Sequence, residues 1–263
     1  MDTATFDVIV IGAGIAGATV AAHLAPERRV AMLEAEEAAG YHSTGRSAAM
    51  YVRNYGPPDV RVLTGLSRRC FDSPPPGFTD HPLLTRRGTL LLARAAETAE
   101  LEAMLKKAEG LREIGMAELA SMVPALKSGY AAMAALAEED ADIDVAALHQ
   151  GFLRRVASCG GVLALGSRAL RIERARGLWE VATARGAVLR ARVLVNAAGA
   201  WGDAVAGIAG VSPLGLTACR RTGVIIDPAP FAPADWPLIC DVGNTWYVRP
   251  EARTRLMVSP ADE

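Results

Sequence analysis

The glycines near the start of the chain are spaced to bind a dinucleotide. They form the pattern Gly12-Ala-Gly14-Ile-Ala-Gly17, which follows an apolar, β-branched run and precedes residues with helical spacing. Gly12 allows a tight turn, Gly14 lets the backbone approach a pyrophosphate, and Gly17 lets helix and strand pack closely. A second apolar run, 30–33, ends at Glu34, close to the offset of about 20 residues at which a carboxylate reaches ribose hydroxyls. The pattern predicts the strand, turn, helix, strand and acid of a dinucleotide-binding domain.

The next segment helps to separate two cofactors that share an adenosine ribose and a pyrophosphate, NAD and FAD. An NAD domain usually continues directly to its next helix and strand, whereas here residues 40–49 are rich in glycine, serine, threonine and alanine. Such residues can bring backbone and side-chain donors close to a second phosphate and a polar ring edge. The segment favours FAD; the structural alternative is a turn followed by a helix capped at Ser47.

Composition excludes several classes of partner. The chain has 263 residues, with 28 Lys and Arg against 29 Asp and Glu, so it has no excess of cations for a nucleic acid or an anionic membrane surface. The apolar run near the N-terminus is interrupted by Gly12 and Gly14, which suits neither a signal peptide nor a transmembrane segment, and we expect a cytoplasmic protein. The four cysteines form no C-x-x-C pair, and we expect small buried thiols.

The middle of the chain predicts an inserted lobe. Residues 89–93 have the composition of a strand, and the charges of 97–108 alternate in sign as on a solvated helix face. Asp142 and Asp144 have no third carboxylate or histidine nearby, so we interpret them as an entry turn and N-cap for a helix at 145–157 and expect no metal site.

Strand patterns dominate the second half of the chain. Short strands at 170–172, 178–182 and 188–190, with glycines at their turns, predict an antiparallel excursion, and the apolar run 193–195 predicts a buried parallel strand that returns to the main sheet. Further strands are predicted at 223–226, 237–241, 245–249 and 256–259.

The sequence resembles the D-amino-acid oxidase (DAO) superfamily of FAD-dependent oxidoreductases, most closely its bacterial D-arginine (D-amino-acid) dehydrogenase branch. The resemblance rests on the fingerprint Gly12–Gly17, on Glu34 and on the run Tyr41–Ala49. The resemblance continues through 142–151, 193–201, 213–216 and 259–261. It implies an α/β fold in which a Rossmann-like FAD-binding domain, 1–78 and 142–212, is interleaved with an α+β substrate lobe on a mostly antiparallel sheet, 79–141 and 213–263. The sheet of this lobe would cover the flavin.

The resemblance also implies which residues bind FAD. They are Gly12, Gly14, Ile15, Ala16, Gly17, Glu34, Ala35, Ser43, Thr44, Arg46, Ser47, Ala48, Ala49, Ala169, Leu170, Ala198, Gly199 and Trp201. His42 could be a covalent flavin tether, as in some relatives, or a turn histidine that hydrogen-bonds locally.

Substrate binding requires a group that holds an amino-acid carboxylate. A guanidinium is the best fork for this purpose, which makes Arg220 and Arg221 candidates. The resemblance selects Arg221, together with Tyr247 and Tyr55, as the active-site residues. The structural alternatives are a solvated strand end for the arginine pair and a packed aromatic for Tyr247.

The chain departs from the D-arginine branch in its expected substrate pocket. Thr89 stands where that branch has an acid for a cationic side chain, Met50 stands where it has a histidine, and Leu238 and Cys240 form an apolar wall. A preference for arginine is therefore not expected.

The sequence predicts an enzyme that oxidises a D-amino acid or related amine by hydride transfer to FAD, giving an imine and then a 2-oxo acid and ammonia. Its electron acceptor is unknown. An NAD(P)-dependent dehydrogenase is one alternative. Because members of the resembling family continue well beyond residue 263, the resemblance also implies a C-terminally truncated chain. Such a chain would be a non-catalytic or partly active FAD-binding fragment.

Overall fold

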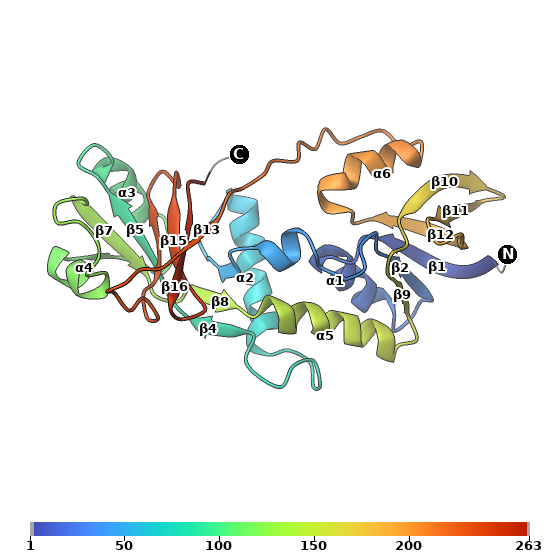
Figure 1. Cartoon of the computed structure of the whole chain (residues 1–263), viewed down its shortest axis with the longest axis horizontal. Helices are drawn as coiled ribbons and strands as arrows, with labels where there is room; N and C mark the ends of the chain where they lie inside the picture. Colours follow the sequence, from blue (N-terminus) through green and yellow to red (C-terminus); the bar gives the residue numbers. More distant parts are fainter. Residues whose placement is uncertain (1–2, 262–263) are drawn as a thin grey trace. The chain divides into compact units, whose positions relative to one another are not determined.

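The computed structural model describes residues 3–261, which divide into two compact units, each built from three separate stretches of sequence (Figure 1). The first unit contains the chain up to Ala49, Pro74–Leu83 and Asp144–Ala218. The second contains Met50–Ser73, Leu84–Ile143 and the chain from Cys219 onward. The two units are interleaved along the sequence, because the chain leaves and re-enters each of them.

The first unit is built on a six-stranded sheet with the order β10-β11-β12-β1-β2-β9. Its strands are β1 (Thr3–Ile11), β2 (Val30–Leu33), β9 (Val162–Ala164), β10 (Ala169–Ala175), β11 (Leu178–Thr183) and β12 (Val188–Asn196). β12, β1, β2 and β9 run parallel, while β10, β11 and β12 form the predicted antiparallel excursion. The carboxyl ends of the parallel strands therefore meet at one edge of the sheet, where open α/β folds bind their ligands.

Both faces of this sheet are covered, as the continuous apolar strands predicted. The helices are α1 (Ile15–Leu24), α5 (Val145–Ser158) and α6 (Gly202–Ile208). Val8 and Val10 pack with residues of α1 and α5 on one face, and Ile9 and Ile11 pack with residues of β10, β11 and α6 on the other. Asp144 caps α5, because its side chain accepts a hydrogen bond from the Ala147 N–H at 2.8 Å.

The second unit has a seven-stranded sheet with the order β13-β16-β15-β14-β5-β7-β6 and a three-stranded sheet with the order β3-β8-β4. The strands are β3 (Met50–Tyr51), β4 (Leu84–Arg86), β5 (Thr89–Ala93), β6 (Leu111–Ile114), β7 (Met133–Ala137), β8 (Ala141–Ile143), β13 (Val224–Ile226), β14 (Leu238–Asp241), β15 (Tyr247–Glu251) and β16 (Arg255–Ser259). The helices are α2 (Pro58–Asp72), α3 (Thr98–Leu105) and α4 (Met116–Met122). All neighbouring strands are antiparallel except β5 and β14, so the mostly antiparallel lobe predicted from the sequence is present.

The units differ from the predicted domains mainly at residues 50–73 and 79–83, and also at 142–143 and 213–218. Residues 50–73 group with the second unit, because Met50 and Tyr51 pair with β8 and the Arg53 N–H donates to Asp140 Oδ1 at 2.9 Å. Residues 74–83 group with the first unit, because Arg154 on α5 donates to the Phe78 carbonyl at 2.5 Å.

Several local predictions are wrong. Residues 188–196 form one strand rather than two, and Val193 is exposed where a buried run was predicted. Asp142 does not form the entry turn of a helix; it lies in β8 and pairs with Arg87. Of the four cysteines only Cys240 is buried.

Most apolar side chains of α2 are exposed, with Leu66 70% accessible. Within residues 3–261, no helix combines the length and the apolar character needed to cross a membrane.

Candidate FAD site and substrate face

The turn after β1 requires glycine at two positions. Gly12 has φ of +100°, and a Cβ atom there would lie 2.4 Å from the Ala197 carbonyl oxygen at the end of β12. A Cβ atom on Gly17 would lie 1.9 Å from the Gly12 carbonyl oxygen. These contacts bring the start of α1 against the ends of two parallel strands, so the first-turn N–H groups face the sheet edge where an anion binds.

Glu34 is tied to this turn. Its carboxylate is buried, and it accepts hydrogen bonds from the Ala13 N–H at 2.9 Å and the Glu36 N–H at 3.0 Å. A carboxylate has about four acceptor positions, so two remain for a ligand. Glu34 therefore fixes the glycine turn and still has lone pairs for ribose hydroxyls.

Residues 40–47 fold over the start of α1 and form a short 3-10 turn, Ser43–Arg46. The Thr44 hydroxyl accepts a hydrogen bond from the Ile15 N–H at 2.9 Å. Ser47 ends this turn in extended backbone, so the alternative of a helix capped at Ser47 is wrong. The segment thus delivers hydroxyl groups to the glycine turn, as expected of a cofactor loop.

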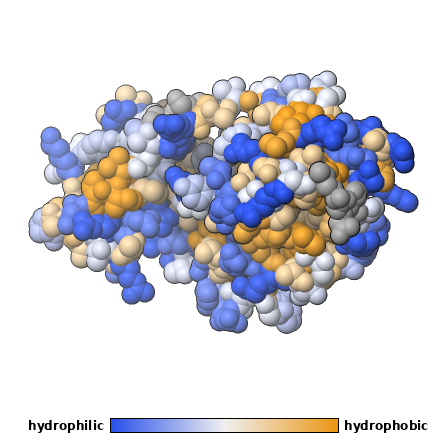
Figure 2. Space-filling model, turned by 45° about the vertical axis from the view of Figure 1, so that its right-hand side comes forward, coloured by the Kyte–Doolittle hydropathy of each residue, from blue (hydrophilic) through white to orange (hydrophobic). Residues whose placement is uncertain are grey.

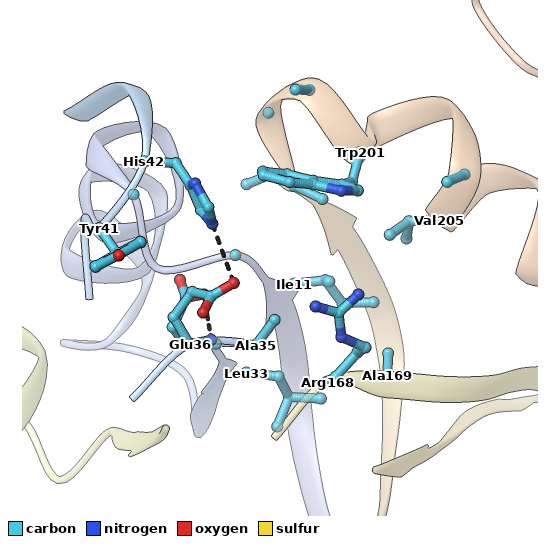
Figure 3. A pocket seen from close by; sticks show the side chains of 18 of the residues that line it. Ile11, Leu33, Ala35, Glu36, Tyr41, His42, Arg168, Ala169, Trp201 and Val205 are labelled. Carbon is cyan, nitrogen blue, oxygen red and sulfur yellow. Dashed lines mark hydrogen bonds and ion pairs between the residues drawn. The ribbon is translucent and has the colours of Figure 1, made fainter. Parts of the chain in front are cut away.

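These elements enclose a cavity of about 210 Å³ in the first unit (Figure 3). The Trp201 ring lies on one side of it, and Leu33, Arg168 and Ala169 lie on the other. His42 contacts Trp201, with ring centroids 4.5 Å apart, and its Nε2 atom is 3.0 Å from the Glu36 carboxylate.

Ten of the predicted cofactor residues line this cavity. They are Gly12, Gly14, Glu34, Ala35, Ser43, Thr44, Ala169, Ala198, Gly199 and Trp201. Eight do not: Ile15, Ala16 and Gly17 belong to the first turn of α1, Arg46 packs over the Tyr41 ring, Ser47, Ala48 and Ala49 follow the 3-10 turn, and Leu170 is exposed on β10.

Sequence reasoning missed two residues that shape the site, Arg168 and His149. Arg168 lines the cavity. His149, on α5, is buried, and its Nε2 atom is 2.8 Å from the Ala13 carbonyl oxygen, so that its N–H can donate to the glycine turn. A single histidine on the apolar side of the predicted helix was the only signal for His149.

The first unit also exposes apolar side chains. Leu170, Trp201 and Ile208 are exposed, and Figure 2, which brings the first unit forward, shows continuous apolar areas bordered by hydrophilic ones.

Comparison with known proteins identifies the family. The family model described as FAD-dependent oxidoreductase (DAO) matches residues 7–263. The chain belongs to this family. Its cofactor is therefore FAD, and the residues around the cavity fit it: the glycines leave room for a pyrophosphate, and the acid and the hydroxyls are placed beside that room.

Solved structures share the fold. Glycine oxidase from Geobacillus kaustophilus has a TM-score of 0.80 at 21% identity, over 97% of this chain and 70% of that one. FAD-bound L-α-glycerophosphate oxidase from Mycoplasma pneumoniae has a TM-score of 0.82 at 15% identity, over 98% and 71%. Iminodiacetate oxidase from Chelativorans sp. BNC1 has a TM-score of 0.72 at 23% identity, over 96% and 70%.

In this member of the DAO family, the predicted substrate residues all lie in the second unit. Parallel pairing aligns Leu238 with Thr89, and antiparallel pairing aligns Cys240 with Tyr247. Because paired residues point to the same side of a sheet, these four side chains share one face. We call this the substrate face; the intervening Ile239 belongs to the core on the other side.

The substrate face is mostly apolar. Burial raises the pKa of the Cys240 thiol to about 12, with smaller contributions from Asp241 and Asp140. Cys240 is therefore an inert, neutral group at neutral pH.

Arg221 and Tyr55 are exposed, and Arg221 lies in the segment 211–223, which has neither helix nor strand. Among the residues that the structure describes, no hydrogen bond, ion pair or ring contact joins Arg221, Tyr247 and Tyr55.

A charged cluster lies beside Tyr247 in sequence. The Arg249 guanidinium is 3.4 Å from Asp142 Oδ1, and the Arg87 Nε–H donates to Asp142 Oδ2. Arg87 also donates to the carbonyls of Ala234 and Trp236, at 3.1 and 2.8 Å, so it ties β8 to the loop before β14.

Proposed function

We propose that this chain binds FAD non-covalently in the cavity of its first unit and oxidises a D-amino acid or a related amine. Family membership and the fit of the glycine turn, Glu34 and Thr44 to a dinucleotide carry the proposal. When bound, FAD would supply the acceptor for the hydride that leaves the substrate Cα. The amine nitrogen supplies the electron pair of the new C=N bond and loses a proton, and water then hydrolyses the imine to a 2-oxo acid and ammonia.

The chain's own residues would bind and orient the substrate. Arg221 would hold the carboxylate through paired N–H groups, which fixes the Cα hydrogen in one direction. Tyr247 would donate from the substrate face, and Tyr55 would close over the substrate from its exposed turn. The similar structures include a glycine oxidase and an iminodiacetate oxidase. Both are named for substrates that contain an amine nitrogen, which supports an amine substrate for this chain.

The substrate face favours an apolar side chain. Thr89, Leu238 and Cys240 carry no charge that could pair with a cationic substrate. Asp241 is engaged elsewhere, because its carboxylate accepts from the Thr245 N–H and the Thr245 hydroxyl, both at 2.6 Å. We therefore place D-leucine, D-methionine and D-phenylalanine above D-arginine and D-lysine as substrates.

The first test is the cofactor. Acid precipitation of the purified chain should release a yellow flavin, and added FAD should raise the melting temperature more than added NADH does. A chain that binds NADH and not FAD would refute the proposal.

The second test is the substrate. kcat/KM should be compared for the five D-amino acids, their L-enantiomers and sarcosine, with oxygen and with an artificial electron acceptor. A strong preference for D-arginine would refute the assignment of the substrate face, while turnover of L-enantiomers alone would refute the stereochemistry.

A further inference from the structure

We infer that Arg168 and Trp201 form a clamp that holds the adenine of FAD between a guanidinium plane and an indole ring. The inference rests on the cofactor site proposed above and not on which substrate is oxidised. Neither side chain belongs to the glycine turn, so the clamp would supply base recognition separately from phosphate and ribose recognition.

The geometry of the cavity carries this inference. Figure 3 shows the Trp201 ring and the Arg168 side chain on opposite sides of the cavity, both directed into it. Gly12, Gly14 and Thr44 are at the phosphate-binding turn, and Glu34 is beside them for the ribose. The group attached to the other side of that ribose is the adenine, and the space left for it is bounded by Ala169, Trp201 and Arg168.

Arg168 is available for a ligand. Within residues 3–261 its guanidinium has neither a hydrogen bond nor an ion-pair partner, although most other arginines of the first unit bind an acid or a carbonyl. A guanidinium stacks well on an aromatic face because it is planar and weakly hydrated. A lysine ammonium is not planar, so replacing Arg168 by lysine would lose the stacking interaction.

Trp201 is braced in its position. His42 packs against the indole, and the Glu36 carboxylate holds the His42 ring through its Nε2 atom at 3.0 Å. These contacts from Glu36, after β2, through His42, before the 3-10 turn, to Trp201 restrain the indole ring before the cofactor binds. It also gives His42 a structural role as an alternative to a flavin tether.

The test separates base recognition from phosphate recognition. FAD binding is measured from flavin fluorescence, and ADP and UDP are measured as competitors; the two share ribose and pyrophosphate and differ in the base. We expect Arg168→Ala to raise the Kd for FAD and ADP about three- to tenfold, and the Kd for UDP less than about twofold, because a smaller ring gains less from stacking. Arg168→Lys should recover only part of the loss.

Matched variants control for effects on folding that are not specific to the adenine site. Arg171→Ala removes an exposed arginine of β10 that pairs with Glu173 at 2.8 Å, and it should bind FAD as the unmodified chain does. Trp201→Phe should bind FAD more tightly than Trp201→Ala, for which we expect about a tenfold rise in Kd.

Three results would overturn the clamp: unchanged FAD binding by Arg168→Ala, equal weakening of ADP and UDP with full recovery in Arg168→Lys, or equal losses in Arg168→Ala and Arg171→Ala. Failure of the unmodified chain to bind FAD would instead refute the cofactor site.

Discussion

Replacing Glu34 by alanine tests how much of FAD binding depends on one carboxylate. Two of its roughly four acceptor positions are taken by the N–H groups of Ala13 and Glu36, which leaves about one for each ribose hydroxyl. Hydrogen bonds to a charged group contribute about 1.5–3 kcal/mol each, and water replaces part of the loss. We therefore expect Glu34→Ala to cost about 2–3 kcal/mol, or roughly 30- to 150-fold in the Kd for FAD.

The same substitution should destabilise the cofactor-free protein. Ala13 is fully buried, and its N–H loses its acceptor, which costs about 1–3 kcal/mol. Glu34→Gln should not restore stability fully, since its amide group turns one acceptor into a donor facing another donor. Glu37→Ala is the control, because Glu37 is mostly exposed and pairs with Arg185 at the surface.

Fluorescence titration gives the Kd, thermal melts of the cofactor-free chains give the stability, and turnover of fully loaded enzyme gives kcat. kcat should change little, because the ribose is remote from the reacting ring. Equal FAD affinity in Glu34→Ala and Glu37→Ala would refute the role of Glu34. A loss confined to kcat would place its action at the flavin instead.

Three further predictions concern stability and reactivity. Gly17→Ala should lower the free energy of unfolding by at least about 3 kcal/mol in urea melts, because its Cβ would lie 1.9 Å from the Gly12 carbonyl oxygen. Gly207→Ala on α6 is the control: its Cβ meets nothing within 4 Å, so the free energy of unfolding should stay the same or rise. The hydrogen bond from the Ala147 N–H, aided by His81, lowers the pKa of Asp144, so its stabilisation is present above the unfolded pKa of about 3.9 and is lost as pH falls through the lower folded pKa. Asp144→Ala should cost about 1 kcal/mol at pH 7 and progressively less as pH falls below the unfolded pKa, and a loss that does not change with pH would contradict this. A disulfide reagent at pH 8 should titrate Cys70, Cys159 and Cys219 in the folded chain and Cys240 only after unfolding, and rapid reaction of all four would contradict the burial of Cys240.

Local signals were sufficient for the glycine turn and for most strands of the first unit. The glycine spacing, the apolar runs of β1 and β2 and the glycines after β10 and β11 each act within a few residues of the element they define. The structure reproduces these elements because glycine adopts the positive φ angles that the turns at Gly12, Gly177 and Gly186 require.

Long-range contacts explain what the sequence did not predict. β12 pairs with β1 over its whole length, so its second half continues as strand and Val193 is left exposed. Asp142 resembles a helix-capping residue locally, but its partner Arg87 lies 55 residues away and holds it in β8. Arg168 had no motif, since it becomes a wall of the cavity only because the N–H groups of Gly166 and Ser167 bind the carbonyls of Glu36 and Glu34 after β2.

The difference between the two units has a physical origin. We expect FAD to be recognised largely by backbone N–H groups and glycines inside one βαβ segment, whereas the substrate face is assembled from β5, β14 and β15, which are joined only by strand pairing. A shift of one residue in the register would exchange Leu238 and Cys240 for Ile239, which lies in the core. Register therefore decides which side chains meet a substrate, and solved structures with this fold have names that include both glycine and glycerophosphate as substrates. We therefore expect Thr89, Leu238 and Cys240 to determine the substrate specificity of this chain.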